Sequence, residues 1–397
     1  MDCRPFLPCP PPALPPMAPV QRGILIGQKD AGVFTRKEAA ARLRALGQDP
    51  ASARTDVELI SLVYSTVDER GAPTMASGLV ALPRARSGPL RVVSYQHGTV
   101  PLRMRVPSNI AALDDPEAIA DTRATLALFA AAGYAVVAAD YIGLGQSPLQ
   151  RHRYMHAATE ASACLDLLRA ARAFSAKIGV EFEPGVFLVG FSQGGHATLA
   201  LQRAIEAAHR EELFVVAAAP AAGTYDMTRT FLQLLDRHDP GIAFHLAYVL
   251  TAYNAIYDVY GSPSEAFTAP YDAQIEGLYE GRHDPTEIGA VLPAKCRDLL
   301  RPAFIAETAD PWHPLRRALC DNDVYAFSPR APVRLYASRA DLDVPYENMV
   351  TAHRELKARG ATVDLVDLGP EDHAGTLMRA LPLAKAWFDT LPACAPH

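Results

Sequence analysis

Ser192 lies in the pentapeptide GFSQG at residues 190–194, between a short apolar run and an alanine-rich segment with helical spacing. The pattern G-x-S-x-G has chemical meaning where a strand turns sharply into a helix, because that turn pushes the serine hydroxyl clear of the sheet. Glycines flank the serine because larger side chains would collide with neighbouring backbone. The amides at the start of the helix help to hold an anion. This setting predicts a serine that attacks a carbonyl carbon.

A base and an acid that would activate this serine follow two later predicted strands. A serine hydroxyl is a weak nucleophile until a base takes its proton, and His373 is placed to do so. Asp341 would hold the imidazole in the required tautomer and offset its positive charge. Asp343 follows the same strand as Asp341, but it lies two residues before Pro345, where an acid more simply caps the next helix. We therefore assign the acid to Asp341.

Strand-like and helix-like segments alternate from residue 56 onward. Apolar runs predict strands at 57–67, 74–82, 90–95, 134–139, 186–189, 214–219, 333–337 and 362–366. Helical spacing predicts helices at 118–132, 157–177, 197–208, 347–359 and 376–390. Mostly apolar strands that alternate with helices indicate an α/β fold, with a mostly parallel sheet covered on both faces. Ligands of such sheets bind beyond the carboxyl ends of the strands, where Ser192, Asp341 and His373 are expected.

The alternation is interrupted between residues 225 and 330, a stretch too long for a plain loop. Eight of the chain's 15 tyrosines fall in it, and Tyr253, Tyr257 and Tyr260 share one face of a predicted helix. That face either packs on the core or lines a cleft under a cap, and the two interpretations are compatible. The chain is therefore expected to comprise a proline-rich tail (1–20), a core (21–224 and 331–397) and a cap insertion (225–330).

These motifs together resemble the α/β-hydrolases, in which the serine, the acid and the histidine follow one another in this order. The segments SYQHGT at 94–99 and DYIGLG at 140–145 narrow the resemblance to the secretory-lipase branch of bacterial and fungal esterases. The resemblance implies an α/β-hydrolase fold with a large cap between the sixth and seventh strands. It also implies hydrolysis of a small-molecule or lipid carboxylic ester through an acyl-serine intermediate, with no cofactor and no metal.

The expected mechanism also predicts oxyanion-binding and substrate-contacting residues. The tetrahedral oxyanion needs backbone donors, and the amide of Gln193 is the first. The loop after the strand at 90–95 would supply the second, which we assign to Thr99, with His97 and Gly98 as alternatives. The substrate would contact Tyr141, Tyr253 and Tyr257.

The same motifs are compatible with other functions. The same triad serves acyltransferases and thioesterases, the GxSxGG elbow also occurs in prolyl-type peptidases, and a hydrolase fold can serve as a noncatalytic binding protein. His152 and His156 have the spacing of a zinc helix, but Arg153 stands where H-E-x-x-H requires glutamate. His196, four residues after Ser192, is more simply a packed, hydrogen-bonded side chain.

The composition limits the classes of partner and the cellular setting that can be expected. The 397 residues carry 38 basic and 44 acidic side chains with no basic stripe, so we expect no nucleic-acid partner. No apolar run reaches the ~18 residues that a membrane span needs. Six scattered cysteines favour free thiols, although Cys296 and Cys320 could bridge in an exported protein. The resemblance favours a secreted or periplasmic protein, whereas eight prolines in the first 20 residues leave no readable signal peptide, so the compartment stays open.

Overall fold

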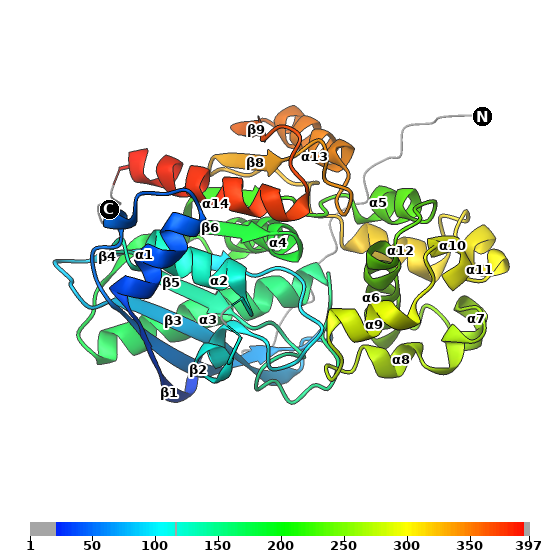
Figure 1. The fold of residues 1–397 in the computed structure, drawn as a ribbon, viewed down its shortest axis with the longest axis horizontal. Helices are drawn as coiled ribbons and strands as arrows, with labels where there is room; N and C mark the ends of the chain where they lie inside the picture. The colour runs from blue at the N-terminus through cyan, green and yellow to red at the C-terminus, as the bar shows by residue number, and fades with distance from the viewer. Residues whose placement is uncertain (1–20, 116, 393–397) are drawn as a thin grey trace.

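The computed structural model describes residues 21–115 and 117–392, and the proline-rich tail at 1–20 lies outside them. The strands in the described part of the chain form one nine-stranded sheet in the order β1-β2-β3-β5-β4-β6-β7-β8-β9 (Figure 1). The pairs β1/β2, β2/β3 and β3/β5 are antiparallel, and the remaining pairs are parallel. The strands are β1 (Leu25–Phe34), β2 (Val57–Val67), β3 (Pro73–Pro83), β4 (Leu90–Gln96), β5 (Ala135–Ala139), β6 (Phe182–Phe191), β7 (Phe214–Ala221), β8 (Val333–Ala337) and β9 (Val363–Asp367). The predicted α/β class is confirmed.

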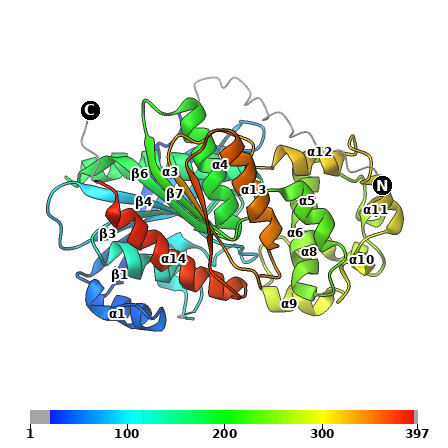
Figure 2. The same ribbon diagram turned by 90° about the horizontal axis from the view of Figure 1, so that it is seen from above.

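Helices cover both faces of the sheet, as Figure 2 shows. Two helices, α1 and α14, lie on one face, and three others, α3, α4 and α13, lie on the opposite face. Their bounds are α1 (Arg36–Ala45), α3 (Ala157–Lys177), α4 (Gln193–Ala208), α13 (Tyr346–Ala358) and α14 (His373–Thr390). The predicted helix at 118–132 is instead a short α2 (Ala120–Thr125) followed by a π-helical turn, η3 (Leu126–Ala130).

A second group of helices lies between β7 and β8, and we call residues 227–321 the helical insertion. In Figures 1 and 2 it projects from one end of the sheet. Its side chains, together with Tyr154 and Met155, form an apolar cluster separate from the core around the sheet. The helices are α5 (Met227–Leu234), α6 (Pro240–Tyr257), α7 (Pro263–Ala266), α8 (Ile275–Leu278), α9 (Pro285–Val291), α10 (Cys296–Leu299), α11 (Pro302–Glu307) and α12 (Pro314–Asp321).

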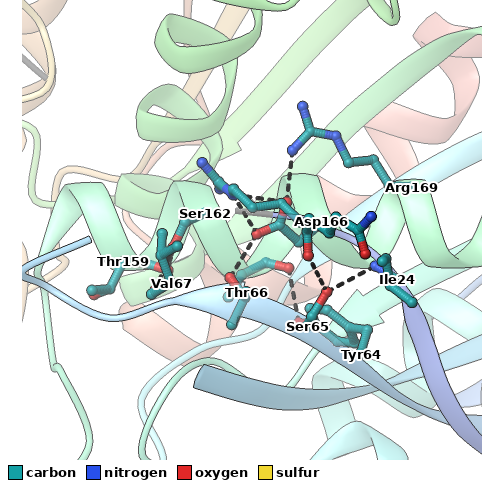
Figure 3. Close-up of polar contacts among 12 residues, drawn as sticks. Ile24, Tyr64, Ser65, Thr66, Val67, Thr159, Ser162, Asp166 and Arg169 are labelled. Carbon is teal, nitrogen blue, oxygen red and sulfur yellow. Dashed lines mark hydrogen bonds and ion pairs between the residues drawn. The ribbon is translucent and has the colours of Figure 1, made fainter. Parts of the chain in front are cut away.

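A buried carboxylate ties the start of the described chain to the sheet and to α3 (Figure 3). Asp166 is fully buried and accepts hydrogen bonds from Thr66 Oγ1 at 2.7 Å, from Arg169 at 2.7 Å and from Arg22 Nε at 2.8 Å. Removing water from a lone carboxylate costs several kcal/mol, so two guanidinium partners are needed to hold this charge. The pair Asp166–Arg169 has the i, i+3 spacing visible in the sequence, whereas Arg22 is 144 residues away from Asp166 along the chain.

Two other expectations concern thiols and membranes. Cys164 and Cys296 are free and buried, so a bridge between Cys296 and Cys320 is ruled out. Among residues 21–115 and 117–392, no helix is both long enough and apolar enough to cross a bilayer.

Candidate active site

Ser192 occupies the tight turn between β6 and α4. The strand ends at Phe191, the helix begins at Gln193, and Ser192 itself has φ 57° and ψ −122°. A positive φ strains a residue that carries a Cβ by about 1–3 kcal/mol and persists only where the surroundings enforce it. One such restraint is the backbone N–H of Ser192, which donates to the carbonyl of Ala221 at the end of β7, 3.0 Å away. The serine is therefore held at a strained strand-to-helix junction.

Two glycines beside Ser192 lie too close to other backbone to carry a side chain. A Cβ at Gly190 would overlap the carbonyl of Gly194, and a Cβ at Gly194 would overlap the carbonyl of Gln96. Because Gln96 is the last residue of β4, the loop after β4 is packed directly against the first turn of α4. This contact brings the candidate oxyanion loop next to the serine.

Asp341 and His373 form a direct pair beyond the ends of β8 and β9. Nδ1 of His373 lies 2.8 Å from Oδ2 of Asp341. The other carboxylate oxygen of Asp341 accepts the backbone N–H groups of Asp343 and Val344, both at 3.0 Å. The imidazole packs against the ring of Phe191 at an interplanar angle of 39°, with ring centroids 4.6 Å apart. The structure thus brings the predicted acid and base together, next to the residue that precedes Ser192.

The electrostatics of this pair favour a basic imidazole. Burial of the His373 ring lowers its pKa, but the hydrogen bond and the charge of Asp341, with smaller effects from Asp343 and Asp372, outweigh burial and hold the pKa above its ordinary value. Asp341 itself is only 5% exposed, so its charge is little screened by water.

Asp343 does not have the capping role that its position suggested. Helix α13 begins after Pro345, and its first turn receives no hydrogen bond from a capping side chain. Asp343 instead lines the cavity beside Ser192. Its charge also acts on the imidazole, because Asp343 helps to raise the pKa of His373.

The two residues predicted as oxyanion donors, Gln193 and Thr99, belong to the first turn of α4 and to the loop after β4. Gln193 is the first residue of α4, and its backbone N–H donates to no group among the described residues, as expected for the first turn of a helix. Thr99 follows Gly98, which packs against Phe191, so the loop passes close to the elbow.

The side chain of Gln193 is held by a buried polar network that we did not anticipate. Its Nε2 donates to Glu160 Oε1 at 2.9 Å and to His152 Nε2 at 2.8 Å. Glu160 also pairs with Nδ1 of His196 at 2.6 Å, and Nε2 of His196 donates to the carbonyl of Asn322 at 2.8 Å. Burial lowers the pKa of His152 to about 4, so its ring is neutral and can accept this bond. His152 and His196 thus serve as hydrogen-bonded packing residues around the elbow.

A cavity opens beside Ser192 and extends into the helical insertion. Its apolar wall comes mainly from α5 and α6. The lining residues are Tyr154, Met155, Ser192, Gln193, Thr224, Met227, Thr230, Phe231, Leu234, His245, Leu246, Val249, Asp343 and Val344. The α5 residues among them recur at i, i+3, i+4 and i+7, a periodicity present in the sequence that could have identified this wall.

The predicted substrate-contact tyrosines lie away from this cavity. The hydroxyl of Tyr141 donates to the carbonyl of His97 at 3.1 Å, and that of Tyr253 donates to the carbonyl of Met155 at 2.9 Å. Tyr257 accepts a hydrogen bond from Asn322 Nδ2 at 3.0 Å. None of the three lines the cavity beside Ser192, and their contacts favour the packing interpretation.

Comparison with known proteins decides the family. A model of the family described as secretory lipase matches residues 118–261. The crystal structure of the rice cell wall degrading esterase LipA from Xanthomonas oryzae superposes with a TM-score of 0.82 at 31% identity, covering 94% of this chain and 99% of that one. The chain belongs to the secretory-lipase family of α/β-hydrolases. It is a carboxylic ester hydrolase.

Two further structures extend the comparison. A protein from Legionella pneumophila superposes with a TM-score of 0.85 at 27% identity, covering 92% of this chain and 97% of that one. Candida antarctica lipase A, at 18% identity with a TM-score of 0.71, covers 95% of this chain and 84% of its own, and shares the fold. A search of curated proteins gives no match.

Proposed function

We propose that this ester hydrolase acts through an acyl-serine intermediate on Ser192, with His373 as the base and Asp341 as the orienting acid. The observation that carries the proposal is the strained elbow at Ser192, with a carboxylate-bound imidazole beside the preceding residue. Strain of this kind is stored where exposure of one side chain serves the chemistry.

The chemical steps follow from these positions. Ser192 Oγ attacks the acyl carbonyl carbon while its proton passes to Nε2 of His373, and Asp341 accepts the Nδ1–H of the resulting imidazolium. The tetrahedral oxyanion is held by the amides of Gln193 and Thr99. Collapse of this intermediate breaks the ester C–O bond, and the leaving alcohol takes the proton from Nε2. Water then repeats the sequence on the acyl-serine, which releases the acid and restores the serine.

Covalent trapping tests this proposal directly. A fluorophosphonate should form a bond between its phosphorus and Ser192 Oγ with loss of fluoride, because Ser192 lies at the strained elbow and a carboxylate-bound imidazole packs beside the residue before it. Mass spectrometry of the digested protein should find the adduct on the peptide that contains Ser192. A His373→Gln variant is the control and should label far more slowly. No adduct, or an adduct on another serine, would restore the interpretation as a noncatalytic binding protein.

The helical insertion is proposed to act as a cap that binds the acyl chain. Two observations support this role: its apolar cluster is separate from the core, and residues of α5 and α6 line the cavity that contains Ser192. Apolar walls favour a hydrocarbon chain because they remove its surface from water at roughly 25 cal/mol per Å².

Narrowing the cavity should change the preference of the enzyme for the length of the acyl chain. Val249 is 6% exposed on α6 and lines the cavity, so Val249→Phe adds bulk where an acyl chain would lie. We expect kcat/KM for p-nitrophenyl esters of twelve to sixteen carbons to fall at least about tenfold, while the acetate ester stays within about threefold. Val291→Phe is the matched control, since this half-buried residue of α9 does not line the cavity. An unchanged profile for Val249→Phe would exclude this cavity as the acyl site.

A further inference from the structure

Helix α6 of the insertion contacts the candidate oxyanion loop at two points. Through one of them, Oη of Tyr154 lies 2.9 Å from Oγ1 of Thr99 and 3.1 Å from Nδ1 of His245, which belongs to α6. Through the other, the hydroxyl of Tyr248, also on α6, donates to the carbonyl of Val100 at 3.1 Å. Helix α6 is therefore linked to two consecutive loop residues, to Val100 directly and to Thr99 through Tyr154.

The rings that carry these hydroxyls form a rigid support. Tyr154 stacks on Tyr248 with ring centroids 4.2 Å apart and an interplanar angle of 11°. Both rings are almost completely buried, and burial raises the pKa of each hydroxyl well above its ordinary value, so both remain protonated and able to donate. Burial also lowers the pKa of His245 to about 4, which leaves a neutral ring with one nitrogen free to accept. The contacts are thus fixed by packing as well as by hydrogen bonds.

We propose that Tyr154, Tyr248 and His245 are positioning residues that set the oxyanion loop, so that the helical insertion organises the catalytic centre as well as covering it. The inference rests on the assignment of Thr99 to the oxyanion hole. An oxyanion donor works only when its N–H points at the place where the oxygen becomes charged, and a misplacement of about 1 Å can cost a hundredfold in rate. The effect should therefore fall on kcat and leave substrate binding almost unchanged.

The test removes single hydroxyl groups and keeps the rings. Tyr154→Phe and Tyr248→Phe should each lower kcat for p-nitrophenyl butyrate by about ten- to a hundredfold, with KM within about threefold of the wild type. The control is Tyr279→Phe, because Tyr279 is equally buried and its ring also packs on Tyr248, but its hydroxyl donates to the carbonyl of Phe244 on α6 and to no residue of the loop. This control should keep kcat within about twofold, and its loss of Tm should match that of the other two variants.

A double variant separates a shared pathway from independent effects. If the Thr99 hydroxyl acts only through Tyr154, then the double variant Thr99→Val, Tyr154→Phe should have the same kcat as the less active of the two single variants. His245→Gln breaks the contact with Tyr154 from the α6 side and gives a second route to the same result if Tyr154→Phe does not fold. Multiplicative losses in the double variant, a change confined to KM, or wild-type kcat in Tyr154→Phe and Tyr248→Phe would each overturn the inference.

Failure of the inference can be told apart from failure of the proposed function. Fluorophosphonate labelling reports on Ser192 in every variant. Normal kcat in the tyrosine variants with labelling retained at Ser192 would overturn the role of α6 alone, whereas absence of labelling in the wild-type protein would overturn the acyl-serine proposal.

Discussion

Alanine at position 192 is expected to lower kcat/KM for p-nitrophenyl esters by at least about four orders of magnitude. The residual rate over water would come only from binding and from the oxyanion donors, because the nucleophile itself is gone. Initial rates with p-nitrophenyl butyrate measure the loss, and circular dichroism verifies the fold. Retention of more than about one per cent of the activity would show that another group attacks the ester.

A glycine at the same position supplies a control for stability. Ser192 is held at φ 57°, which costs about 1–3 kcal/mol for a residue with a Cβ and almost nothing for glycine. Ser192→Gly should therefore be as inactive as Ser192→Ala but more stable, with a gain of about 1 kcal/mol in the free energy of unfolding. Urea denaturation of the two variants measures the difference. Equal stability would mean that the turn carries no strain.

Asparagine at position 341 is expected to reduce kcat by about 10⁴ while the loop keeps its shape. The Oδ1 of Asp341 accepts the amides of Asp343 and Val344, and the carbonyl oxygen of asparagine can keep both bonds. The amide group of asparagine would then face Nδ1 of His373 and favour the tautomer with its proton on Nε2. That tautomer cannot take the proton of Ser192. Steady-state kinetics measures the effect, and unchanged kcat would remove Asp341 from the triad.

Asp343→Asn is the matched control because it changes a neighbouring carboxylate by the same single group. Its charge helps to hold the pKa of His373 above the ordinary value, so its removal should lower that pKa. The base must be neutral to act, and kcat/KM falls as the pH drops through its pKa. The acidic limb of the kcat/KM profile should therefore move to lower pH in Asp343→Asn, with at least about a tenth of kcat retained at pH 8. A limb that stays in place would show that Asp343 does not act on His373.

The fold could be predicted where apolar runs and helical spacing were unambiguous. The ranges of β8 and α3 match the expected ones residue for residue, because each is bounded by clear turn signals. Strand β1 was missed because most of its side chains are exposed and it lacks an apolar run. Helix α4 begins at Gln193 rather than at Ala197, because Gly194 and Gly195 disguise its first turn.

The candidate site could be predicted in outline because the order of parallel strands brings their carboxyl ends together. Residues that follow β6, β8 and β9 therefore meet at one edge of the sheet. The tyrosines on one face of α6 did not indicate which residues line the cavity, because a tyrosine hydroxyl can also be satisfied by a buried carbonyl, as that of Tyr253 is. The contact of Glu160 with Gln193 depends on how α3 packs against α4, which no local pattern encodes.

The close approach of Gly194 to Gln96 also limits how this protein can evolve. A single methyl group added at position 194 would push the loop after β4 away from α4. Because that loop carries Thr99, such a substitution would separate the two proposed oxyanion donors even though it touches neither of them. The second glycine of the motif therefore constrains the spacing between α4 and the loop after β4. A substitution there would require compensating changes in that loop.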